Sequence, residues 1–115
     1  MLLNVQCLNS CKMGEIYVSI CDFRELNILC FVETWATYDS VDSFQIDGFT
    51  LGSYFCRSNY RGGGISIYLR DCLSFEKINL DKFCKEKHIE VCGLIFKSKD
   101  KYGSFQSCGT HPQVI

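Results

Sequence analysis

The chain has 115 residues, a net charge of −1, and 47% hydrophobic against 22% charged residues. This length allows one small domain, and the balance is typical of a globular protein rather than a disordered one. The near-neutral charge gives no support for nucleic-acid binding through bulk charge. No apolar run approaches membrane-spanning length, and residues 1–4 lack the basic start of a signal peptide. We therefore expect an intracellular protein without a membrane partner.

The chain is unusually rich in cysteine, with nine in total. Because the number is odd and no secretion signal precedes them, we interpret most of them as reduced thiols that act as small hydrophobic side chains. A zinc site is the alternative, but no pair has the tight Cys-x-x-Cys spacing of structural zinc sites. The pairs at three- or four-residue spacing are Cys7 with Cys11, Cys84 with His88, and Cys108 with His111.

The first part of the chain predicts a strand–helix–strand unit. Residues 2–8 form the first predicted strand. Apolar side chains then recur at steps of three and four, which predicts a helix over residues 13–26. Residues 28–33 are apolar except for the last, so they predict a strand buried on both faces. A unit of this length predicts two parallel strands with a right-handed crossover.

The middle of the chain predicts a hairpin. Residues 37–43 form a polar loop, and Asp47-Gly48 is a turn signal. Residues 53–57 and 65–70 are the two predicted strands around a glycine-rich connection. Alternation in the second of them predicts one apolar and one half-polar face.

The last third of the chain is less regular. Residues 80–88 are either a short helix or a loop, and residues 89–96 predict another interior strand, with Glu90 as its only polar residue. Residues 99–115 begin with charges and continue with Gly, Ser and Gln without periodicity. We expect them to form a poorly ordered tail after a domain of residues 1–98.

Glu33 is the first candidate for chemistry. A carboxylate is costly at the end of a buried strand unless its charge is used, and ligands collect at the carboxyl ends of strands in α/β sheets. If the first two strands are parallel neighbours, Asn4 can point at the same site. A carboxylate and an amide oxygen suit Mg²⁺ or Mn²⁺, which keep several waters. The pattern alone favours a plainer interpretation, a strand-end acid in water and a turn or cap residue.

A glycine-rich segment is the second candidate. Arg61, Gly62 and Gly63 start a run in which the backbone can approach a phosphate and the arginine can hold it. The run does not match a Walker loop, and its spacing favours a hairpin loop whose glycines supply positive φ. Trp35 and Tyr60 are candidates for stacking on bases, although packing over the edge of the core is the interpretation we favour.

Several segments together resemble one family. Asn4 in its strand, Glu-Thr-Trp at residues 33–35, Asp-Gly-Phe at 47–49 and the Arg-Gly-Gly-Gly strand at 61–68 occur in order. They look like the N-terminal half of an endonuclease/exonuclease/phosphatase (DNase I-like) domain, closest to those of non-LTR retrotransposons. The resemblance covers about residues 3–96. It implies an α/β fold, a partial DNase I-like α/β sandwich, of which this chain supplies roughly one β-sheet with its helix.

The resemblance also implies an activity, the Mg²⁺- or Mn²⁺-dependent hydrolysis of phosphodiesters, usually DNA nicking in the nucleus. In the family, the residues that match Asn4 and Glu33 lie at the metal site. The family's later motifs are absent here: a tyrosine after the strand that ends near Phe96, a Gly-Asp-Phe-Asn-like segment and a Ser-Asp-His-like segment. We therefore expect a truncated domain that is inactive or nearly so by itself.

Two alternatives stay open. The chain is a non-enzymatic binding module or an unstable relic if half a sandwich exposes an apolar sheet face, which would drive self-association. It belongs to another branch of the superfamily, such as phosphoinositide phosphatases or sphingomyelinases, if the Arg-Gly-Gly-Gly strand is not specific to the retroelement branch.

Overall fold

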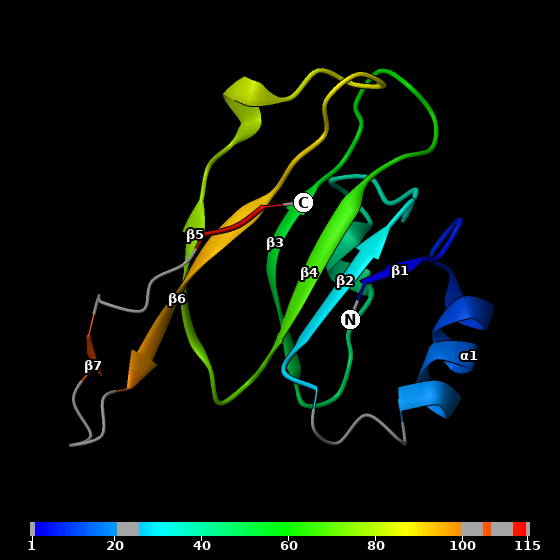
Figure 1. The fold of residues 1–115 in the computed structure, drawn as a ribbon. Helices are drawn as coiled ribbons and strands as arrows, with labels where there is room; N and C mark the ends of the chain where they lie inside the picture. The colour runs from blue at the N-terminus through cyan, green and yellow to red at the C-terminus, as the bar shows by residue number, and fades with distance from the viewer. Residues whose placement is uncertain (1, 21–25, 100–104, 107–111, 115) are drawn as a thin grey trace.

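The computed structural model in Figure 1 describes residues 2–20, 26–99, 105–106 and 112–114. These residues form a mixed α/β fold that consists mostly of strands, with little helix. The elements in chain order are β1 (Leu2–Asn4), α1 (Ser10–Ile20), β2 (Ile28–Val32), the 3-10 turn η1 (Val41–Ser43), β3 (Phe49–Phe55), β4 (Ile65–Arg70), β5 (Ser74–Ile78), the 3-10 turn η2 (Asp81–Phe83), β6 (Gly93–Lys99), β7 (Phe105–Gln106) and β8 (Pro112–Val114).

The first sheet has the strand order β1-β2-β4-β3. β1 runs parallel to β2 with α1 between them in the chain, which confirms the predicted strand–helix–strand unit. β3 and β4 pair antiparallel, as the hairpin prediction required, and β4 also pairs antiparallel with β2. β4 therefore lies between two hydrogen-bonded neighbours, and its residues from Ile65 to Leu69 are all buried. The half-polar face predicted for this strand is thus not open to solvent.

Two boundaries in the first unit differ from prediction. β1 ends at Asn4 rather than at residue 8, because Gln6 and Cys7 adopt positive φ and bend the chain. α1 begins at Ser10 rather than at residue 13. Asn9 caps it, since its Oδ1 accepts a hydrogen bond from the Lys12 N–H at 2.9 Å. Residues 21–25, part of the predicted helix, lie outside the described residues.

The described residues form two sheets, whereas we expected roughly one. β5 and β6 pair antiparallel with each other, and β7 and β8 pair with β6. A tight turn after β4, in which the Leu73 N–H donates to the Arg70 carbonyl at 3.0 Å, directs the chain away from the first sheet. The register shifts by one residue around Gly52, where an added Cβ would lie 3.1 Å from the side chains of Leu69 and Leu94. A glycine there lets the second sheet approach closely.

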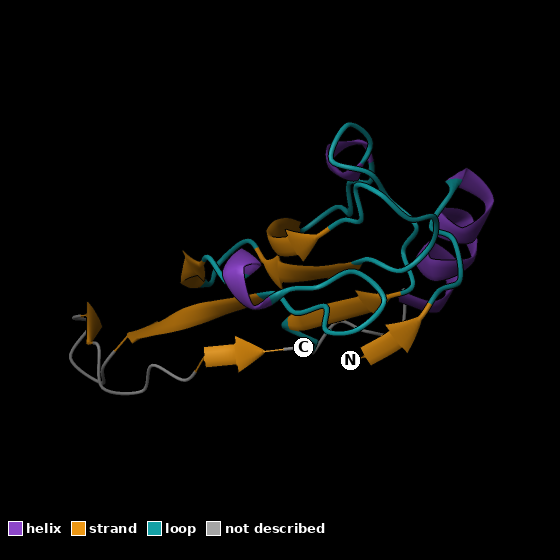
Figure 2. Cartoon of the chain, turned by 90° about the horizontal axis from the view of Figure 1, so that it is seen from above, coloured by secondary structure: helices purple, strands orange, loops and turns teal. Residues whose placement is uncertain are grey.

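The first sheet is covered on both faces (Figure 2). α1 and the segment before β3 cover one face, and the second sheet covers the other. Leu2 and Leu3 of the edge strand β1 are nevertheless 64% and 38% exposed, and self-association stays a prediction. The first cluster comprises Val5, Leu8, Met13, Ile16, Leu29, Phe31, Ile46, Phe49 and Tyr68. The second comprises Cys30, Phe55, Ile65, Ile67, Leu69, Cys92 and Leu94.

The last third of the chain differs in part from prediction. Residues 80–88 contain η2 and a loop that is closed by a bridge between Lys85 and Ile89. The interior strand begins at Gly93 rather than at residue 89. Within the predicted tail, residues 105–106 and 112–114 form β7 and β8, and residues 100–104, 107–111 and 115 lie outside the described residues. None of the helices in the described part of the chain is long and apolar enough to cross a membrane.

Candidate metal-binding site at the carboxyl end of β2

The register of the first sheet brings the backbones of Asn4 and Glu33 to the same edge. Asn4 pairs in parallel with Val32, the residue before Glu33. Val32 packs against the cluster between the two sheets, so Asn4 lies on the face that is directed toward the second sheet. The parallel pairing on which the metal-site prediction depends is therefore present. The role of the two side chains stays a prediction.

The backbone around Glu33 is strained. Glu33 has a φ of 58° and Trp35 a φ of 57°, both in the left-handed region that non-glycine residues rarely adopt. Each such residue costs about 1–2 kcal/mol, so the surrounding structure must hold it in place. Thr34 between them is buried, with 1% of its surface exposed. Strain of this kind clusters at functional sites.

Hydrogen bonds hold this strained segment from both sides. The N–H groups of Cys7 and Leu8 donate to the carbonyls of Glu33 and Thr34 at 2.9 and 2.8 Å. On the other side, the N–H groups of Thr34 and Trp35 donate to the carbonyls of Gly64 and Gly63 at 3.4 and 2.8 Å. The segment is thereby fixed between the chain after β1 and the glycine-rich loop.

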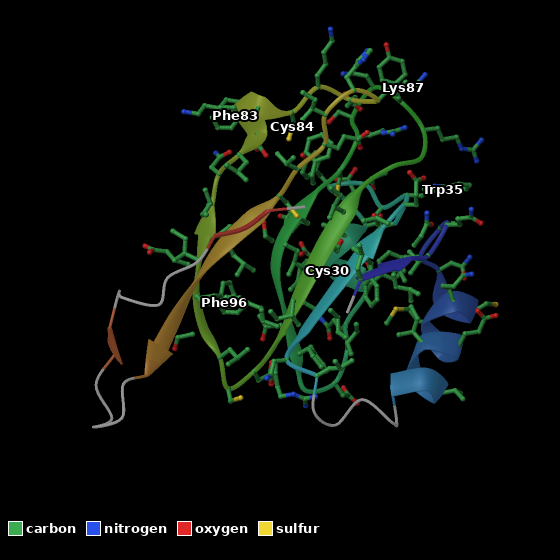
Figure 3. The ribbon with its side chains drawn as sticks, in the orientation of Figure 1. Cys30, Trp35, Phe83, Cys84, Lys87 and Phe96 are labelled. Carbon is green, nitrogen blue, oxygen red and sulfur yellow. The ribbon has the colours of Figure 1, made fainter. Side chains whose placement is uncertain are left out.

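The Glu33 carboxylate is partly oriented by its neighbour. The Trp35 indole Nε1–H donates to Glu33 Oε2 at 3.1 Å. The Trp35 ring is 47% exposed and lies beyond the end of β2, at the rim of the first sheet (Figure 3). Glu33 thus presents a partly exposed carboxylate at the sheet edge, as a metal ligand requires.

The glycine-rich loop wraps around an arginine rather than around an empty anion site. Gly62 and Gly63 have φ values of 86° and 61°, which only glycine adopts readily. A Cβ on Gly63 would collide with the Arg57 guanidinium. Arg57 Nη1 donates to the backbone carbonyl of Arg61 at 3.0 Å, and the Arg61 side chain is exposed. The interpretation that these glycines supply positive φ is confirmed, and phosphate binding by Arg61 stays a prediction.

An ion pair between Arg57 and Glu90 lies under this loop. Arg57 Nε contacts both carboxylate oxygens of Glu90 at 3.0 and 2.9 Å, and Nη2 contacts Oε2 at 2.7 Å. The two side chains are 15% and 13% exposed. The hydrogen bond from Arg57 to Glu90 raises the pKa of Arg57. Burial by itself would raise the pKa of Glu90, but the hydrogen bonds from Arg57 and from backbone N–H groups lower it overall.

Sequence reasoning missed this pair. The signal was present, because Glu90 is the only polar residue in an otherwise apolar predicted strand and Arg57 ends another predicted strand. The two candidate aromatic residues are about half exposed. Trp35 is 47% and Tyr60 51% exposed, and Lys87 Nζ lies 4.2 Å from the Tyr60 ring centroid, so packing over the edge of the core and stacking on bases both stay predictions.

The donor set fits a hard divalent cation in part. The backbones of Asn4 and Glu33 lie at one end of the sheet, and an amide oxygen and a carboxylate are the kinds of ligand that suit Mg²⁺ or Mn²⁺. Within the described part of the chain, no group of three or more His, Cys, Asp or Glu residues could hold a metal. Any Mg²⁺ there would complete its shell with water and with substrate oxygens, as Mg²⁺ commonly does.

The cysteines in the described part of the chain are free thiols. Burial raises the pKa of Cys56 to about 11 and that of Cys92 to about 12, so both stay protonated at neutral pH. Cys30, Cys56 and Cys92 are buried, as small hydrophobic side chains would be, whereas Cys11 and Cys72 are exposed. Of the candidate zinc pairs, Cys108 and His111 lie outside the described residues.

No protein-family model matches the sequence, and a search of curated proteins finds no match.

Proposed function

We propose that this chain is part of an endonuclease/exonuclease/phosphatase domain of the retrotransposon type, in which Asn4 and Glu33 bind Mg²⁺ for phosphodiester hydrolysis in DNA. The observation that carries this proposal is the parallel pairing of β1 with β2. This pairing brings the backbones of Asn4 and Glu33 to the same end of the first sheet. The strained backbone at Glu33, which is held by hydrogen bonds on both sides, supports the proposal further. Such strain lowers stability and is found mainly at functional sites.

The roles of the chain's own residues follow from their surroundings. Glu33 and Asn4 supply the oxygen ligands, and the Trp35 indole holds one carboxylate oxygen. Bound Mg²⁺ supplies charge stabilisation at the phosphate and leaving oxygen. Arg61, exposed on the adjacent loop, is available to contact a phosphate of the substrate. The partial sandwich of the DNase I-like fold is proposed on the same grounds.

The 115 residues do not complete this machinery. The motifs that position the attacking water and the phosphate in this family are absent from the sequence. Loss of such groups commonly lowers rates by several powers of ten. The chain assayed by itself therefore binds the metal and does not cleave at a useful rate.

Binding of Mn²⁺ tests the proposal directly. Trp35 is the only tryptophan, so its indole N–H gives a single NMR signal beside Glu33. We expect Mn²⁺ to broaden this signal and the Asn4 side-chain amide selectively, and Glu33→Gln to abolish the effect. Glu15→Gln, which removes a carboxylate that is 73% exposed on α1, is the matched control and leaves the broadening unchanged. Broadening that survives Glu33→Gln, or is absent from the wild type, refutes the proposal.

A further inference from the structure

We infer that Arg57 and Glu90 are positioning residues that hold the Glu33 carboxylate and the Trp35 indole in place through the glycine-rich loop. What Glu33 then does rests on the proposed function. The positioning itself follows from three contacts in series. The ion pair contacts the loop, the loop contacts the backbone of residues 34–35, and the Trp35 indole contacts the Glu33 carboxylate.

The first contact fixes the loop from below. Glu90 Oε1 accepts a hydrogen bond from the Gly64 N–H at 3.3 Å, and Arg57 Nη1 donates to the Arg61 carbonyl at 3.0 Å. The pair thus binds the loop at both ends of its three glycines. Glu90 Oε2 also accepts from the Lys87 N–H at 3.0 Å, which ties the β5–β6 connection to the same point. Figure 3 shows Lys87 at the top of the molecule, above the start of β4.

A second carboxylate anchors the start of the same loop. Glu86 accepts hydrogen bonds from the backbone N–H and the side-chain amide of Asn59, each at 2.9 Å. The backbone hydrogen bond from Asn59 is the main cause that lowers the pKa of Glu86. The β5–β6 connection therefore holds the β3–β4 loop at two places, and the loop has little freedom to shift as a body.

The second and third contacts carry this constraint to the site. The carbonyls of Gly63 and Gly64 accept hydrogen bonds from the backbone N–H groups of Trp35 and Thr34, respectively. The Trp35 indole N–H in turn donates a hydrogen bond to the Glu33 carboxylate. An added Cβ on Gly62 would lie 3.6 Å from Trp35 Nε1 and 3.7 Å from Arg57 Nη1, so both groups lie against this one glycine. The loop also packs closely against Thr34, because a Cβ added to Gly64 would lie 2.6 Å from Thr34 Oγ1.

The strain at Glu33 makes this support necessary. Left-handed backbone at Glu33 and Trp35 persists only while its surroundings favour it. Without the ion pair, the loop loses the groups that fix both ends of its glycines. The segment can then relax, and the hydrogen bond between Trp35 and Glu33 is lost. Hydrogen bonds that orient a metal ligand act in this way, and their removal typically weakens metal binding by about 10- to 100-fold.

The first test needs no metal. The indole N–H signal of the wild type is compared with that of Glu33→Ala, which removes the acceptor. We expect Arg57→Gln and Glu90→Gln to move the signal to the Glu33→Ala position. Each leaves one charge buried without its partner and can impair folding. The double variant Arg57→Met/Glu90→Leu leaves neither such a charge nor a side-chain hydrogen-bond partner for the loop, so it is the decisive one. Lys12→Gln, which breaks the exposed ion pair on α1, is the matched control.

The second test uses Mn²⁺ as the probe. We expect the Mn²⁺ concentration that half-broadens the indole signal to rise about 10-fold in the folded double variant. A wild-type indole signal in the double variant overturns the inference, whatever the metal does. Absence of Mn²⁺ binding to the wild type refutes the proposed function instead, and the metal-free comparison still decides the positioning role.

Discussion

At the residue scale, the candidate site depends on the three glycines of the β3–β4 loop, Gly62 to Gly64, which have different neighbours. Gly63 has a φ of 61° and lies against the Arg57 guanidinium, which Glu90 holds in place. Because Arg57 cannot easily move, a side chain at Gly63 meets both backbone strain and a collision. This residue should therefore be intolerant of even a methyl group.

We expect Gly63→Ala to lower the free energy of unfolding by at least about 1 kcal/mol. Gly14 is the matched control, because it lies in α1 with nothing within 4 Å of an added Cβ. Gly14→Ala should raise the free energy of unfolding by about 0.5–1 kcal/mol through helix propensity. Urea denaturation of the two variants measures both changes. Equal effects of the two substitutions would contradict the tight loop.

The Glu90 carboxyl gives a pH-dependent prediction. Its pKa is below the ordinary value of 4.5 in the folded state, so unfolding takes up a proton in the acid range. The stability that it contributes is present above about pH 4.5 and is lost as the pH falls through the folded-state pKa. Urea midpoints from about pH 6 to about pH 3 should fall more steeply for the wild type than for Arg57→Gln/Glu90→Gln. Parallel profiles would exclude a stabilising role for the pair.

Residue-scale features differ in how far the sequence predicts them. Glu33 and Asn4 could be selected because a carboxylate after an apolar strand is locally anomalous. Glu90 was also anomalous in its apolar segment, but its pairing with Arg57 could not be predicted, because the two residues are 33 positions apart and meet only when two sheets pack together. The strain at Glu33 was equally hidden, since left-handed backbone at a non-glycine residue has no sequence signal.

At the element scale, the contact between the two sheets holds the β5–β6 connection over the site. Leu94 of β6 is fully buried against residues of β3 and β4. Its truncation leaves a cavity, because the close approach at Gly52 limits how far the sheets can collapse. The loop that carries Glu86 and Glu90 depends on this packing.

We expect Leu94→Ala to lower the free energy of unfolding by about 2–5 kcal/mol. Ile89→Ala is the control from the adjoining connection, since Ile89 is 57% exposed and its truncation should cost less than about 0.5 kcal/mol. Chemical denaturation provides both values. A loss below about 1 kcal/mol for Leu94→Ala would mean that the sheets do not pack as described.

Elements with strong local patterns could be predicted, and elements set by long-range packing could not. The buried strand β2, the β3–β4 hairpin and the parallel β1–β2 pair follow from apolar runs and turn residues. The pairing of β5 with β6 in a separate sheet does not, because nothing local indicates whether β5 extends the first sheet or leaves it. The early end of β1 depends on two positive φ values that were not visible in the sequence.

At the scale of the whole molecule, the proposed function implies part of a hydrolytic site without the groups that would complete it. Asn4 and Glu33 lie at the rim of the first sheet, and the 115 residues lack the family's later motifs. We expect no Mg²⁺-dependent nicking of supercoiled plasmid above the level of Glu33→Gln. Nicking by the wild type that requires Mg²⁺ and disappears in Glu33→Gln would show that this chain is catalytically sufficient.

The central claim is that Glu33 and Asn4 share one divalent cation. Diffraction from crystals grown with Mn²⁺, with data collected for anomalous scattering, tests it most directly. We predict an anomalous peak with a Glu33 carboxylate oxygen and the Asn4 amide oxygen both within about 2.5 Å, and no such peak in crystals of Glu33→Gln. A well-ordered site at these residues without a peak, or a peak bound by other side chains, would contradict the claim.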